Sequence, residues 1–163
     1  DYGVAGVCAG RAEFGPRALG NRSLLADPRD PNIKDKVNEI KKRQKFRPFA
    51  PSVLSEHAQA FFITSKCDNY DYMQYAVPCI KKQDIPSVVH VDGSSRVHTV
   101  SKESAKYSPL RHILELWYQR TGCPILLNTS LNIKGMPMVN DLADSQLFEK
   151  KYNMKVCNGK SKN

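Results

Sequence analysis

Short, unbroken apolar runs along the chain indicate buried strands. The two clearest are Val4–Ala9 and Pro124–Leu127, and each leads into glycine or small polar residues. Two further runs, Ser87–Val91 and Arg96–Val100, are rich in β-branched residues and are separated by Asp-Gly-Ser-Ser. Because β-branched residues favour strands and a short glycine-containing connection favours a turn, we expect a hairpin here.

Apolar residues at helical spacing predict the helices. The clearest case is Ser108–Arg120, where an apolar stripe runs from Leu110 to Trp117 and Gly122 provides a stop. We interpret Trp117 as a core residue. Another predicted helix begins near Pro31 and has Ile33, Val37 and Ile40 on one face. Two further helices are predicted at Ser55–Phe62 and Leu142–Tyr152.

The order of these elements predicts a single α/β domain over residues 1–152, with a twisted mixed sheet and flanking helices. Pro48 and Pro51 impose extended chain on residues 46–54. We expect residues 64–86 to be mostly loop, and residues 153–163 to form a flexible basic tail.

Charge adds an expectation about partners. The chain of 163 residues is 40% hydrophobic, as a globular domain is, but carries a net charge of +9. Nucleic acid, phosphorylated metabolites or the acidic face of another domain would suit that charge. With no apolar run of about 18 residues and no signal peptide, the sequence predicts a cytoplasmic protein without membrane contact. Because the chain starts with Asp, we expect it to be a piece of a longer protein.

The cysteines and histidines do not predict a metal site. The five cysteines, at positions 8, 67, 79, 123 and 157, are odd in number and include no Cys-x-x-Cys pair. Buried thiols in a reducing compartment are the simpler interpretation. His90 and His98 are interpreted as ordinary strand residues.

The stretch Gly10–Arg29 is a candidate phosphate site. Its arginines, at positions 11, 17, 22 and 29, alternate with glycines and small residues. Glycine permits close approach of a ligand to the backbone, and each guanidinium presents a planar, charged fork to phosphate oxygens. The alternative is a solvated basic loop whose arginines pair with Glu13 and Asp27.

Three other groups are candidates for binding. Lys41, Arg43 and Arg47 follow the first predicted helix, and would converge with Arg17 and Arg22 if that helix returns beside the loop. The alternative is a solvated helix face. Asn128, Ser130 and Asn132 follow a buried strand in a predicted turn, where they orient a ligand or satisfy their own backbone. Arg96 stands in a strand-like segment, where an arginine often faces water.

Four blocks of the chain, in the same order, resemble the C-terminal domain of the O-carbamoyltransferases that modify nodulation factors and antibiotics. The resemblance extends to the YrdC-like domain of threonylcarbamoyl-adenylate synthases, whose nucleotide site uses a Lys-x-Arg pair and a Ser-x-Asn pair. Lys41 with Arg43, and Ser130 with Asn132, match those pairs. The resembling blocks are residues 10–29, 46–54, 90–100 and 121–135.

The resemblance implies a reaction in which carbamoyl phosphate and ATP give carbamoyl-adenylate and pyrophosphate. Fixed cations and in-line placement would supply the catalysis, without a protein nucleophile. The implied catalytic residues are Lys41, Arg43 and Arg17. The implied substrate and nucleotide ligands are Arg22, Arg47, Arg96, Asn128, Ser130 and Asn132.

The same resemblance implies cofactors and a partner. Mg²⁺ would arrive with ATP, held mainly by phosphates and water. An N-terminal transferase domain, absent from this chain, would hold an iron site and pass the carbamoyl group to an acceptor hydroxyl.

Departures from the family pattern leave other functions open. Ala9 and His98 stand where the family commonly has Gln, and Met136 where it has Glu. These changes affect acceptor handling and domain contacts more than nucleotide binding. The main alternative is a nucleic-acid-binding module, including one within a carbamoyltransferase that acts on hydroxymethylated DNA bases. A third interpretation is a docking domain that kept the fold and lost the reaction.

Overall fold

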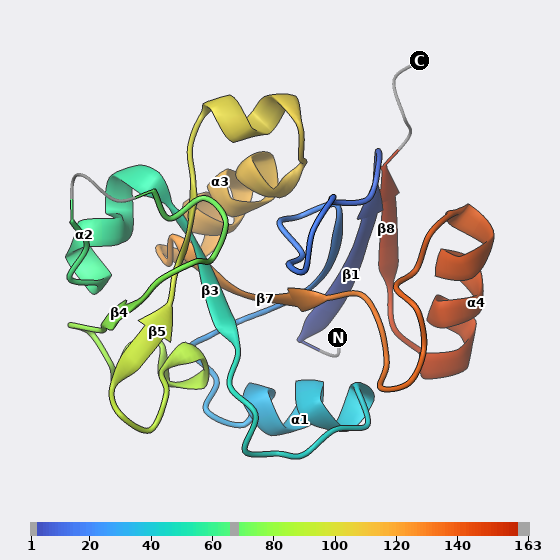
Figure 1. Ribbon diagram of the computed structural model, residues 1–163, viewed down its shortest axis with the longest axis horizontal. Helices are drawn as coiled ribbons and strands as arrows, with labels where there is room; N and C mark the ends of the chain where they lie inside the picture. Colours follow the sequence, from blue (N-terminus) through green and yellow to red (C-terminus); the bar gives the residue numbers. More distant parts are fainter. Residues whose placement is uncertain (1–2, 66–68, 160–163) are drawn as a thin grey trace.

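A six-stranded mixed sheet forms the centre of the computed structural model, which describes residues 3–65 and 69–159. The strand order is β6-β3-β7-β2-β1-β8 (Figure 1). β2 pairs antiparallel with β1 and β7, and β3 with β7, whereas the outer strands β8 and β6 run parallel to β1 and β3. The strands of this sheet are β1 (Val4–Ala9), β2 (Arg22–Ala26), β3 (Ala50–Leu54), β6 (His98–Val100), β7 (Ile125–Ser130) and β8 (Val156–Gly159).

Helices cover both faces of the sheet. Strand side chains alternate between two apolar clusters, so that Leu24 belongs to the cluster completed by α1 and α4, and Leu25 to the cluster completed by α3. Both leucines are buried. The helices are α1 (Ile33–Ile40), α2 (Ala58–Phe61), α3 (Leu110–Thr121) and α4 (Leu142–Tyr152), with 3₁₀ turns at Ser55–His57, Pro86–Val88 and Glu103–Lys106.

The predicted α/β class, with a mixed sheet and flanking helices, is confirmed. The first strand and the final helix have the predicted bounds. α3 ends as predicted at Gly122, whose φ of 70° is left-handed. Trp117, a residue of α3, is partly buried and packs against the apolar cluster on that face of the sheet. The finer expectation, a YrdC-like fold, stays a prediction.

The predicted hairpin of residues 87–100 is wrong. Pro86 begins a 3₁₀ turn in place of the first strand, because proline has no N–H to offer a ladder. The second run divides into β5 (Ser94–Arg96) and β6, which belong to different sheets. β5 pairs with β4 (Ala76–Pro78), inside the predicted loop of residues 64–86.

In the centre of the sheet, two strands differ from the sequence prediction. β2 lies inside the stretch that was predicted as a phosphate loop. β7 continues to Ser130, so Asn128 is a strand residue and not a turn residue. Asn128 is paired on both sides, with Leu25 of β2 and Ala50 of β3. These two ladders outweigh the local turn preference of Asn-Thr-Ser.

The predicted flexible tail is wrong for residues 156–159, which form β8. β8 lies parallel to β1, with Val156 opposite Gly6. A Cβ on Gly6 would lie 2.9 Å from a Val156 methyl carbon, so the glycine is what admits this buried valine. Residues 160–163 of the predicted tail lie outside the described residues.

The expectation of buried thiols is confirmed for Cys8, Cys79 and Cys123, which are free and buried. It is wrong for Cys157, which is exposed, and Cys67 lies outside the described residues. Over the described residues, no helix combines the length and the apolar character that crossing a bilayer requires.

Candidate functional site

A polar cavity of about 130 Å³ gathers segments that are distant in the sequence. It lies between the loop after β1, the segment after α1, the end of β5 and the end of β7. Of the described residues that line it, none is acidic. Five of the predicted site residues line it: Arg17, Arg43, Arg96, Asn128 and Ser130.

The cavity has an uncompensated positive charge. Burial lowers the pKa of Arg96, and the Arg17 charge lowers it further. Burial and the Arg47 charge likewise lower the pKa of Arg43 to about 10. Arg43 Nη2 and Arg96 Nε are buried, with no hydrogen-bond partner among residues 3–65 and 69–159. An anion would relieve both the repulsion and the unpaired donors.

Arg43 is held in place by two neighbours. Its Nε donates to Asn38 Oδ1 over 2.6 Å, and its guanidinium stacks over the ring of Phe49, 4.4 Å from the centroid. Asn38 is fully buried in α1, and its amide donates to the carbonyls of Lys45 and Arg47. Asn38 therefore fixes both the arginine and the loop that follows it.

Lys41 lies behind the cavity wall, with 4% of its surface exposed. Its Nζ donates to the carbonyls of Ser130, at 2.5 Å, and Asn132, at 2.9 Å. It also reaches Asn132 Oδ1 at 2.9 Å and Ser130 Oγ at 3.3 Å, and Ser130 Oγ donates to that same Oδ1. Lys41 thus crosslinks the end of α1 to the end of β7, and its charge lies directly behind Ser130.

We expect Lys41 to make stability depend on pH. Burial and the Arg43 charge lower its pKa to about 7, against 10.5 for a free lysine. Between these values the unfolded chain binds the proton and the folded protein does not, so this residue makes stability rise as pH rises from about 7 to about 10.5. Chemical denaturation across this range should give a steeper rise for the native protein than for Lys41→Met. If the stability of the two proteins changed with pH in the same way, the four oxygens of Ser130 and Asn132 that contact Nζ would keep Lys41 charged across this pH range.

Arg22 does not line the cavity. It is buried in β2, and its guanidinium donates to five backbone carbonyls. These belong to Ala9, Gly10, Asn21, Val139 and Asn140, at 2.6–3.2 Å. Arg22 therefore ties the loop after β1 to the segment before α4, and the predicted contact with substrate stays a prediction.

The other predicted residues surround the cavity at different depths. Arg17 is exposed at its edge. Arg47 is exposed and acts on the site through its charge on Arg43. Asn132 does not line the cavity. Its Oδ1 accepts hydrogen bonds from Lys41 and from Ser130, which does line it.

Sequence reasoning missed several residues that build the cavity. Phe49 and Met73 contribute apolar walls, and Met73 adopts a left-handed backbone with φ of 54°. That conformation is strained for a side chain other than Gly, Asn or Asp. Asn38 carried no local signal, because consecutive helix positions are about 100° apart and Asn38 therefore lies off the face that Ile33, Val37 and Ile40 define. Met73 likewise carried no signal, because it follows a polar, tyrosine-rich segment.

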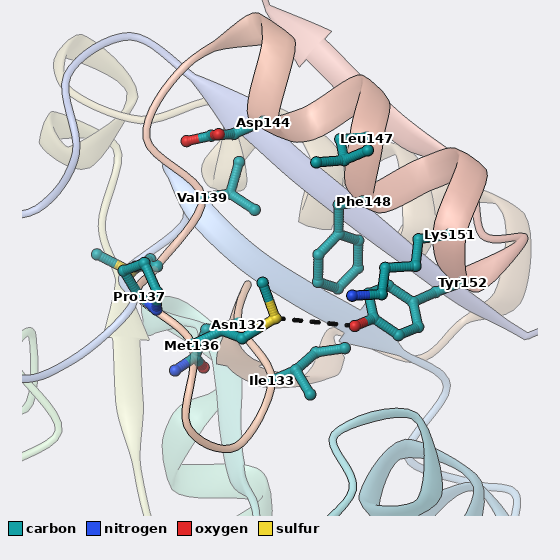
Figure 2. A pocket seen from close by; sticks show the side chains of 11 residues that line it. Asn132, Ile133, Met136, Pro137, Val139, Asp144, Leu147, Phe148, Lys151 and Tyr152 are labelled. Atoms are coloured by element: carbon teal, nitrogen blue, oxygen red, sulfur yellow. Dashed lines mark hydrogen bonds between the residues drawn. The ribbon is translucent and has the colours of Figure 1, made fainter.

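A second, smaller pocket of about 90 Å³ adjoins Asn132 on the side of α4. Figure 2 shows Met136 and Tyr152 pointing toward one another across it, and the Tyr152 hydroxyl donates to the Met136 sulfur over 3.9 Å. Phe148 and Leu147 of α4 complete its apolar lining. Met136, which departs from the family pattern, therefore belongs to this apolar pocket and not to the arginine cavity.

The cavity does not present metal ligands of its own. In the described part of the chain, no group of three His, Cys, Asp or Glu side chains is placed to hold a metal ion. Because the described lining of the cavity includes three arginines and no carboxylate, a divalent cation there would take most of its oxygen ligands from a bound substrate and water.

Comparison with known proteins identifies relatives. Residues 1–158 match the family described as "Carbamoyltransferase C-terminus". The chain is 46% identical over 149 residues to nodulation protein NolNO of Sinorhizobium fredii, a match that covers 89% of this chain and 22% of that protein. It is 43% identical over 147 residues to nodulation protein NolO of Bradyrhizobium diazoefficiens, covering 87% and 26%.

An uncharacterized protein of Methanocaldococcus jannaschii is 40% identical over 148 residues, covering 87% of this chain and 23% of that protein. The chain thus spans about a quarter of the length of the curated relatives that it matches.

Proposed function

Because the chain belongs to the carbamoyltransferase C-terminus family, we propose that it forms carbamoyl-adenylate within a longer O-carbamoyltransferase. The observation that supports this most is the cavity lined by Arg17, Arg43 and Arg96, in which no described lining residue is acidic and two buried guanidinium nitrogens, Arg43 Nη2 and Arg96 Nε, have no hydrogen-bond partner among the described residues. Such a site suits a reaction between two anions, because fixed cations reduce their repulsion.

In the proposed reaction, a carbamate oxygen attacks the α-phosphorus of ATP. The bond from that phosphorus to the bridging oxygen breaks, and pyrophosphate leaves with the electron pair. Carbamoyl phosphate supplies the carbamate once water has removed its phosphate. The arginines would bind the oxygens that carry charge at the reacting phosphorus, and no protein nucleophile is needed.

Lys41 and the Ser130–Asn132 pair would support this chemistry from behind the cavity. In its protonated form, Lys41 places a positive charge 3.3 Å from Ser130 Oγ, and Ser130 lies in the cavity wall. Its hydrogen bonds to Ser130 and Asn132 would hold β7 at a fixed distance from Arg43. Mg²⁺ would enter with ATP, bound by phosphate oxygens and water.

The remaining steps are proposed for the rest of the longer protein. An N-terminal domain with an iron site would transfer the carbamoyl group from the adenylate to an acceptor hydroxyl. The chain described here would supply that domain with the activated group.

The proposed function is tested by pyrophosphate exchange on the full-length protein. With Mg²⁺ and carbamoyl phosphate, we expect labelled pyrophosphate to enter ATP, and the exchange to stop when carbamoyl phosphate is left out. The control is Lys45→Ala. Lys45 is an exposed cation on the loop that also carries Arg43, but it does not line the cavity, so this variant should keep the native exchange rate. Release of ADP with no exchange would contradict attack at the α-phosphorus.

A further inference from the structure

Met136 lies in the apolar pocket beside α4, with its sulfur facing a hydroxyl group. The residue is 47% exposed, and the Tyr152 hydroxyl donates to its sulfur over 3.9 Å (Figure 2). A thioether sulfur is a weak acceptor, so this contact contributes little to stability by itself. Met136 also stands where the family commonly has Glu, so neither the arginine cavity nor the family pattern accounts for it.

Exposure separates Met136 from the other methionines. The chain has four methionines, of which Met73 and Met154 are only 4% and 3% exposed. Met138 lines the same pocket as Met136 and is partly buried. Peroxides convert a methionine thioether to a sulfoxide, which is polar and chiral. Met136 is therefore the methionine that a dissolved peroxide reaches most readily.

The hydroxyl that faces Met136 is held in place. Tyr152 is the last residue of α4, and its ring packs against the ring of Phe148 with the centroids 4.8 Å apart. Lys151 Nζ lies 5.6 Å from the centroid of the Tyr152 ring. These neighbours fix the ring, so its hydroxyl stays on one side of the Met136 sulfur.

The separation of the two atoms suits an oxidised sulfur. An S–O bond of about 1.5 Å and an O–H···O hydrogen bond of about 2.7 Å together span 3.9 Å when the angle at the sulfoxide oxygen is about 135°. In an apolar pocket, a sulfoxide oxygen without a donor would be costly. Here Tyr152 supplies the donor at the required distance.

We propose that Met136 is a site of peroxide oxidation, and that Tyr152 binds the oxygen of the resulting sulfoxide. A lone pair of the sulfur attacks one oxygen of hydrogen peroxide, so the S–O bond forms as the O–O bond breaks. The leaving hydroxide takes the proton from the transferred oxygen and departs as water. Two electrons pass from the sulfur to the peroxide. This modification is independent of the reaction proposed for the arginine cavity.

The position of Tyr152 gives the oxidation a stereochemical preference. The sulfoxide sulfur is chiral, and only one of the two epimers directs its oxygen toward the Tyr152 hydroxyl. The same hydroxyl can bind the oxygen while it is being transferred, so this epimer should form in excess. Its hydrogen bond would link the segment after β7, which carries Met136, to the end of α4.

Peroxide treatment of the full-length protein, followed by peptide mass spectrometry, tests the site. We expect Met136 to be oxidised about tenfold faster than the buried Met73 and Met154. Reductases that each accept one sulfoxide epimer then measure the epimer ratio. The native protein should give about a fivefold excess of one Met136 epimer, the effect of one hydrogen bond, and Tyr152→Phe about equal amounts.

Two controls separate Tyr152 from its surroundings. Lys151→Ala removes another donor from the pocket lining and should keep the native excess. Met138 is the internal comparison, because its epimer ratio should not change in Tyr152→Phe.

Three results would overturn the proposal. Oxidation of Met136 no faster than that of Met73 would mean that the full-length protein covers the side chain. Equal epimers in the native protein would reject the role of Tyr152, and this measurement stands even if Tyr152→Phe does not fold. An excess that persists in Tyr152→Phe and disappears in Lys151→Ala would assign the sulfoxide oxygen to the lysine.

Discussion

Arg43→Ala is expected to lower the rate of carbamoyl phosphate-dependent pyrophosphate exchange by about 100-fold to 1000-fold, with little change in stability. Arg43 lines the cavity with an unpaired Nη2, and its position is fixed by Asn38 and by the ring of Phe49. A fixed cation of this kind stabilises charge that develops in the transition state, and water in the vacated space would not replace it. Exchange kinetics under saturating ATP would measure the loss.

Arg43→Lys provides the matched comparison. It keeps the charge but loses the planar fork and the stacked position over Phe49, so we expect it to recover only part of the rate. A second comparison is Asn38→Leu, which leaves the guanidinium present but no longer held at Nε. If Arg43→Ala retained the native exchange rate, the cavity would not be the site of the reaction.

Arg22→Met is expected to destabilise the fold by about 3 kcal/mol, which is the largest effect on stability that we predict for a charged residue. Arg22 is 5% exposed, and its guanidinium donates to five backbone carbonyls from three separate segments. Methionine fills much of the space but removes one donor from each of these carbonyls, of which that of Asn21 keeps the Ala9 N–H. Urea denaturation with a constant slope would measure the change in the free energy of unfolding.

Arg17→Met is the control for this prediction. Arg17 is also an arginine of the Gly10–Arg29 stretch, but it is exposed at the cavity edge. We expect the Arg17→Met variant to weaken binding of carbamoyl phosphate without a measurable loss of stability. The opposite result, a stable Arg22→Met protein that no longer binds the anion, would return Arg22 to the ligand-binding role that the sequence suggested.

Local patterns in the sequence predicted the helices better than the strands. α3 was predictable because its apolar spacing and its end signal lie within or next to the segment. β2 and β8 were not, because their existence depends on partners: β2 fills the gap between β1 and β7, and β8 needs the space that Gly6 leaves for Val156. Pairing between distant segments leaves little trace in either segment alone.

For the candidate site, the sequence indicated the chemistry but not the geometry. Arg17, Arg43 and Arg96 were candidates because arginine suits phosphate, and the structure places all three in one cavity. The same reasoning could not separate Arg22, which has the same residue type in the same stretch but donates to backbone carbonyls. Nor could it predict that Ser52 would form hydrogen bonds with both His98 and Asn128, because these residues lie in three different strands.

The pairing of β8 with β1 has a consequence for how the chain folds during synthesis. Gly6 and Val156 are neighbours in the sheet, yet nearly the whole domain separates them in the sequence. Closing so long a loop costs entropy before the contact contributes, so this edge of the sheet should be completed late. Until the ribosome has released almost the entire domain, β1 keeps a free edge that another nascent chain could pair with. Within this domain, the first strand in the sequence is therefore among the last to be covered.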